Sequence, residues 1–134
     1  MILQRLYLPI SRADVERLRT AGELRAGRTA YGVSPALSAA TPRADEEERE
    51  YLAFLDAVAV AAAAAGDDKR TAVLAIDVPD GEVSWPPAGT ATTIGRAILR
   101  REAVSFHIGA APGPDADLLW YDVTEAELVE DLLR

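Results

Sequence analysis

Apolar and polar positions follow two different periods along this chain, and together they predict both strands and helices. Residues 2–8 are rich in branched and aromatic side chains and stop at Pro9, which predicts a first strand. A nearly continuous apolar run within residues 70–78 predicts a central strand covered on both faces. Other strands are predicted at residues 29–34, 82–85, 103–108 and 118–123.

Capping residues mark two of the predicted helices. Ser11 and Asp14 have the spacing of a capping box, so a first helix is expected to start there and to end at Gly22 or Gly27. The segment Thr124–Glu127 repeats this spacing and predicts a short C-terminal helix.

A longer helix is predicted in the middle of the chain. It begins at Thr41-Pro42 or at Asp45 and is closed by Gly66. Four successive carboxylates at residues 45–48 point around the helix, so they indicate a solvated helix start rather than a cation site. The predicted core stripe consists of Tyr51, Phe54 or Leu55, Val58 and Ala62.

The order of elements predicts an α+β fold. We expect a single domain over residues 1–134, with a mixed, mostly antiparallel sheet, two main helices and a short C-terminal helix. A chain of 134 residues with 49% hydrophobic content suits one core. The breaker-rich segment 110–115 is therefore expected to be a loop and not a domain linker.

Composition excludes several kinds of chemistry. The absence of cysteine rules out disulfides, thiolate metal sites and cysteine nucleophiles. A net charge of -8 disfavours binding to nucleic acid, whose phosphates are also negative. Neither a signal peptide nor a membrane-spanning run is evident. Scattered glycines offer no phosphate-binding loop. The chain is thus expected to be a cytoplasmic, soluble protein with no cofactor.

Two polar positions in predicted strands stand out. His107 is the single histidine, and it is expected beside Ser105 on the less buried sheet face, opposite Val104, Phe106 and Ile108. Asp77 lies within the central apolar strand, where a carboxylate needs a partner. It is expected to pair with an arginine such as Arg5 or Arg70, or to lie at the strand end near Pro79.

The segment around Trp120 and Tyr121 is the leading interaction candidate. Asp117 and Asp122 flank the two aromatic residues, which should point to opposite faces of a strand. The outward one would serve as an anchor for a partner protein, whereas the alternative is that both complete the core. The leading hypothesis is a non-catalytic interaction or regulatory domain with a protein partner, whose oligomeric state the sequence leaves open.

Six segments carry a resemblance over nearly the whole chain. In this order they resemble a family of small actinobacterial proteins of unknown function. That resemblance implies a bacterial protein but brings no established activity. The segments are Leu6–Pro9, Tyr31–Leu37, Glu47–Phe54, Asp77–Asp80, Phe106–Ile108 and Leu118–Tyr121.

A second resemblance concerns the order of elements. Strands containing Arg5, Tyr7 and Tyr31, a long helix and the run at residues 73–79 are similar in outline to ADP-ribosyltransferase-like domains. This resemblance implies NAD binding by an early-strand arginine or histidine and orientation of the ribose by a late glutamate. Those roles would fall to Arg5 and to Glu125 or Glu127. The early strand lacks the histidine-glycine pattern of these enzymes, and the serine motif of their arginine class is not evident.

Overall fold

The chain folds into eight strands and four helices in an α+β arrangement, as the sequence pattern predicts. The computed structural model describes residues 1–134. The strands are β1 (Leu3–Pro9), β2 (Glu23–Leu24), β3 (Arg28–Gly32), β4 (Ala72–Pro79), β5 (Ala91–Ile94), β6 (Ile98–Leu99), β7 (Ala103–Gly109) and β8 (Leu118–Asp122). The helices are α1 (Arg12–Ala21), α2 (Pro35–Ala40), α3 (Glu46–Ala65) and α4 (Ala126–Leu132), and three short 3₁₀ turns are η1 (Asp80–Glu82), η2 (Arg100–Glu102) and η3 (Val123–Glu125).

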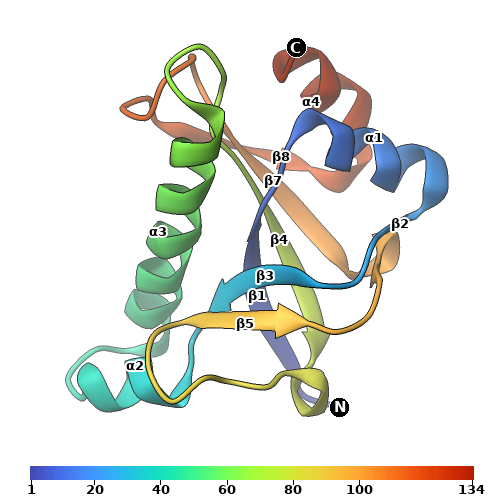
Figure 1. Cartoon of the computed structure of the whole chain (residues 1–134). Coiled ribbons are helices and arrows are strands. Elements are labelled where there is room, and N and C mark those ends of the chain that lie inside the picture. The colour runs from blue at the N-terminus through green and yellow to red at the C-terminus, as the bar shows by residue number, and fades with distance from the viewer.

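Six of the strands form one sheet in the order β5-β3-β1-β4-β7-β8, and each neighbouring pair is antiparallel. Strands β2 and β6 form a separate two-stranded ladder. Helix α3 lies against one face of the sheet, whereas α1 and α4 pack together on the other (Figure 1). The apolar β4 is an inner strand and is covered on both faces, as predicted.

Each face of the sheet has its own core. Sixteen buried residues, among them Leu6, Leu74 and Phe106, fill the side of α1 and α4. Six buried residues fill the side of α3, where the helix contributes only alanines, Ala53, Ala57 and Ala61. No helix combines the length and the apolar character that crossing a membrane requires.

The predicted core stripe of α3 was wrong. Tyr51 is 59% exposed, and Phe54 and Val58 only border the core that the three alanines fill. The reason is steric, because methyl side chains let the helix backbone approach the sheet closely while larger residues are left at the edges of the contact.

The helix ends agree with the capping residues. Ser11 and Asp14 form the predicted capping box of α1, and Gly22 ends this helix with a φ of 76°. The Asp45 carboxylate accepts from the Glu48 backbone N–H at 2.8 Å, so α3 starts at the second of the two predicted positions. Residues 45–48 are exposed, as expected for a solvated helix start.

Several short elements differ from the prediction. The strand expected at residues 82–85 is absent, because this segment ends η1 and continues without regular structure. Strand β5 pairs with β3 instead. Helix α2 was missed, although Pro35 holds its first position and the Ser34 hydroxyl accepts from the Leu37 N–H at 3.1 Å.

Two local details of β7 and β8 also correct the prediction. A register shift opposite Ala75 and Ile76 turns Val104 toward the core under α3, away from Phe106 and Ile108. The capping box before α4 is formed by Asp122 and Glu125, around η3, and not by Thr124 and Glu127.

Candidate functional site

The α3 side of the sheet carries several of the predicted site residues, among them Arg5, Asp77, His107 and Trp120. Helix α3 packs against β1, β3 and β4, whereas β7 and β8 extend beyond it. His107 and Trp120 are directly opposite each other on β7 and β8 and therefore share a face. His107 packs against Phe54 of α3, which identifies that face as the α3 side.

Arg5 and Asp77 are paired on this face. They are opposite residues of β1 and β4, and Arg5 Nε lies 2.6 Å from Asp77 Oδ1 while Nη2 lies 3.2 Å from Oδ2. The hydrogen bond with Asp77 raises the pKa of Arg5 above its ordinary value. The bidentate contact satisfies the carboxylate in the central strand, as one of the sequence alternatives predicted.

His107 lies between the sheet and α3. Its Nε2 atom is 2.9 Å from the Ser105 hydroxyl, and its ring packs edge-on against Phe54 with the ring centroids 5.1 Å apart. Burial lowers the pKa of His107, and the positive charge of Arg5 acts in the same direction. The imidazole is therefore neutral at pH 7. Ser105 is buried and no carboxylate bonds His107, so the two residues lack the orienting group of a catalytic triad.

The low pKa of His107 predicts a pH dependence of stability. Below about pH 6.5 the unfolded chain takes up a proton that the folded imidazole resists. The free energy of unfolding should therefore fall as the pH is lowered from that value through the folded pKa, with a slope of at most about 1.4 kcal/mol per pH unit. Urea unfolding at pH 7.5, 6.5 and 5.5 measures this slope, and His107→Gln should flatten it.

Proton NMR provides the independent check, because the chain has one histidine and hence one imidazole titration curve. A folded-state pKa at or above about 6.5 would contradict this account.

Four aromatic rings form a row on the α3 side of the sheet, of which Tyr51 and Trp120 are exposed and Phe54 and His107 are half-buried. We call Tyr51, Phe54, His107 and Trp120 the aromatic row. Phe54 is its centre, with Tyr51 stacked at a centroid distance of 6.4 Å and His107 on the other side. Trp120 extends the row on β8 and is 62% exposed. Tyr121 points the other way and packs against the core under α1 and α4, so the outward aromatic is Trp120.

A shallow hollow of about 270 Å³ opens beside the row, and we call it the acidic hollow. Its aromatic walls are Tyr7, Tyr51, Phe54 and His107, and its two charged residues are Glu47 and Glu50. Burial and the nearby Glu50 both raise the pKa of Tyr7, so its hydroxyl stays protonated. No lysine or arginine lines this hollow, and the neighbouring Arg5 is paired with Asp77, so its two glutamates give the hollow an acidic lining.

Comparison with known proteins places the chain in a family. The model of a family of unknown function, DUF6912, matches residues 4–115. The chain belongs to DUF6912. No curated protein and no solved structure matches it.

The expected resemblance to a family of unknown function is thus confirmed. The DUF6912 match includes Arg5, Asp77, His107 and the acidic hollow. It ends before β8, so the segment Leu118–Tyr121, which carried part of the resemblance, lies outside it. An actinobacterial origin stays a prediction.

The carboxylates near β8 have different surroundings in this DUF6912 chain. Asp117 is exposed at the start of the strand. The Asp122 carboxylate accepts from the Thr124 hydroxyl and from the Thr124 N–H at 2.9 Å, and these bonds lower its pKa. Asp122 is therefore a capping residue as well as a neighbour of the aromatic row.

Glu125 and Glu127 lie away from Arg5. They line a hollow of about 640 Å³ with Leu18 and Phe106, which belong to the core under α1 and α4. Arg5 lies on the α3 side, where it pairs with Asp77 and is influenced by Glu50. The two roles that the ADP-ribosyltransferase resemblance implies thus lie on opposite faces of the sheet, without a common cleft.

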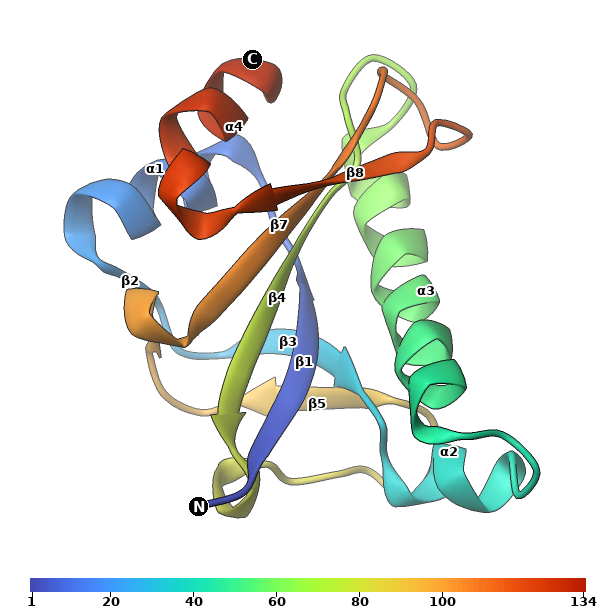
Figure 2. The same cartoon turned by 180° about the vertical axis from the view of Figure 1, so that it is seen from behind.

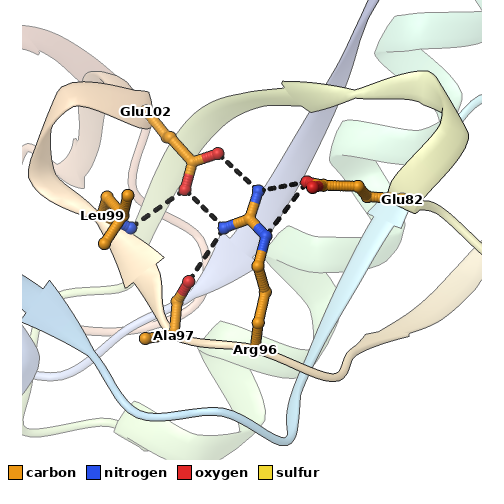
Figure 3. A network of polar contacts seen from close by, with 5 residues as sticks. All are labelled: Glu82, Arg96, Ala97, Leu99 and Glu102. Atoms are coloured by element: carbon orange, nitrogen blue, oxygen red, sulfur yellow. Dashed lines mark hydrogen bonds and ion pairs between the residues drawn. The ribbon is translucent and has the colours of Figure 1, made fainter.

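The side chain of Arg96 forms an extensive hydrogen-bond network that the sequence did not predict. Arg96 donates five hydrogen bonds, to the carboxylates of Glu82 and Glu102 and to the Ala97 carbonyl (Figure 3). Burial opposes ionisation of Glu102, yet its bonds with Arg96 and the Leu99 N–H lower its pKa overall. All the N–H donors of the Arg96 guanidinium are used. The network therefore links η1 to η2 and leaves no free donor to bind a ligand.

Proposed function

We propose that this chain is a non-catalytic protein-interaction domain that binds an extended, basic segment of a partner protein along β8. The observation that carries this proposal is the exposed Trp120 on the outermost strand, continuous with the aromatic row and the acidic hollow. Large aromatics that a monomer leaves in solvent are typical anchors of interfaces.

The free edge of β8 supports an extended partner. β8 is the last strand in the sheet order, so one side of its backbone has no partner strand (Figure 2). Such an edge offers N–H and C=O groups to an added strand. Leu119 and Trp120 are both exposed and point to opposite faces, so an added strand would find apolar contacts on each side.

Charge supports a basic segment. Residues 103–133 include seven carboxylates and no lysine or arginine. Glu47 and Glu50 add negative charge at the far end of the aromatic row, and its rings can hold an ammonium or guanidinium group by cation–π attraction. Pairing of two copies through β8 is disfavoured by the same charges, because Asp117 and Asp122 would face like charges across the interface.

Replacing Trp120 should weaken partner binding without unfolding the protein. The probe is a fluorescent peptide of alternating arginine and valine, with a matched peptide of alternating glutamate and valine as its control. Trp120→Ala should weaken binding of the arginine peptide at least tenfold, about 1.4 kcal/mol, because an interface anchor is lost. Fluorescence anisotropy measures the affinity.

Val60→Ala is the matched control variant, since Val60 is an exposed apolar residue on α3 outside the aromatic row. It should bind like the unaltered protein. Equal binding of both peptides, absence of binding, or full binding by Trp120→Ala would each overturn the proposal. Sedimentation of the free protein as a dimer that Trp120→Ala dissociates would assign β8 to a second copy instead.

A further inference from the structure

A second hollow has the opposite electrostatic character. It has a volume of about 600 Å³ and lies where the start of α1, the end of α3, the loop before β4 and the last residues of the chain meet. Its charged residues are all cations: Arg12, Lys69, Arg70 and Arg134. We call it the cationic hollow.

The cationic hollow is positively charged, whereas the chain as a whole is negatively charged. The protein has 22 acidic and 14 basic residues, yet no aspartate or glutamate lines this hollow. The acidic hollow and the hollow under α4 both include glutamates. Four cationic side chains around one concavity attract an anion to it.

The hydrogen-bonding capacity of these cations is largely unused. Arg12 Nε is buried and has no hydrogen-bond partner, which is costly unless a ligand supplies one. Lys69 takes part in no ion pair, and Arg70 donates only through Nη1, to the Gly109 carbonyl at 2.9 Å. Arg134 pairs with Asp131 at an exposed position, where such a pair is weak.

The carboxylate of Glu130 does not supply the missing hydrogen-bond partner of Arg12. The positive charge of Arg12 helps to lower the pKa of Glu130, but both oxygens of this carboxylate are bonded to Arg19 on the last turn of α1. Ser11 also lines the hollow as the N-cap of α1, so the positive end of the helix dipole adds to the field of the side chains.

The remaining lining is apolar. Three alanines at the end of α3, Ala61, Ala64 and Ala65, face Ile10 and Leu133 across the hollow. The volume lies within the range of small-molecule sites, which combine an apolar lining with a few placed polar groups. A ligand for this hollow therefore has an anionic end and an apolar body.

We propose that the cationic hollow binds a small organic phosphate. The phosphate oxygens bond the Lys69 ammonium group and the guanidinium groups of Arg12 and Arg70, whose planar forks match phosphate geometry. The organic part lies on the alanine surface of α3. This site is independent of the partner surface at β8, and either can exist without the other.

Calorimetric titration of the full chain at low salt tests the proposal with three probes: adenosine monophosphate, adenosine and inorganic phosphate. Adenosine monophosphate should bind at least tenfold more tightly than either of the others, because it alone engages both the cations and the apolar lining. If inorganic phosphate binds as tightly as adenosine monophosphate, the hollow does not recognise the organic part of the ligand. If adenosine binds as tightly, the hollow does not recognise the phosphate.

Variants locate the site. Lys69→Gln alters an exposed loop residue and should fold normally, while weakening adenosine monophosphate binding severalfold; Arg12→Gln should weaken it at least tenfold. Arg101→Gln removes the same charge from an exposed position outside the hollow and should have no effect. Unchanged affinity in Lys69→Gln and Arg12→Gln, or equal loss in Arg101→Gln, overturns the proposal, as does failure of the unaltered protein to bind.

Discussion

Phe106→Ala should lower the free energy of unfolding by about 3–5 kcal/mol, the largest effect expected of any single substitution considered for this protein. Phe106 is 1% exposed and is the largest of the fully buried side chains. It lies on β7 between β4 and β8, in the core under α1 and α4. Truncation removes its apolar contacts and leaves a cavity that the surrounding strands cannot close.

Urea unfolding followed by circular dichroism measures this loss, and Trp120→Ala is the informative comparison. Trp120 is larger than Phe106 but mostly exposed, and its position on an edge strand limits the cost of truncation to about 1 kcal/mol. A loss of several kcal/mol in Trp120→Ala would show that this residue belongs to the core, and the proposed interaction surface would lose its anchor.

Ala57→Leu should destabilise the protein by about 1–3 kcal/mol, although leucine is the more hydrophobic residue. Ala57 has no exposed surface and belongs to the core between α3 and the sheet, with Tyr7, Val73 and Ala75. Extra carbon atoms at this position have no space, so the helix must move away from β1 and β4 or the side chain must leave its preferred rotamer.

Ala59→Leu is the matched control for this effect. Ala59 is exposed on the same helix, and the identical substitution there should change the unfolding free energy by no more than about 0.5 kcal/mol. Similar results for the two variants would mean that α3 is not held by its alanine face. The urea midpoints of both variants, at a constant unfolding slope, provide the measurement.

The error in the predicted face of α3 has a clear physical origin. Periodicity selects the most hydrophobic stripe, which contains Tyr51 and Val58, because burial is assumed to follow hydrophobicity. In a helix with so many alanines, closeness of approach decides the packing instead, and it favours Ala53, Ala57 and Ala61. The strands were easier to predict, since β1, β4, β7 and β8 have enough branched and aromatic residues to be evident locally.

The site was predictable only in part, because the exposure and pairing of its residues depend on how the elements pack together. Alternation separates Trp120 from Tyr121 in any strand, but which one faces solvent depends on where α3 and α4 lie. The pairing of Arg5 with Asp77 was one of two arginine alternatives, and only the register of β1 and β4 decides it. The cationic hollow draws its residues from four separate segments, so no local pattern could indicate it.

Helix α3 contributes to both hollows, with Glu47 and Glu50 near its start and Ala64 and Ala65 at its end. Its 20 residues span about 30 Å, and the nearest α3 residues of the two hollows, Phe54 and Ala61, are about two turns apart. The buried contact with the sheet is made through methyl groups, which interlock less deeply than long side chains. A rigid-body displacement of α3 along the sheet would therefore change the lining of both hollows together.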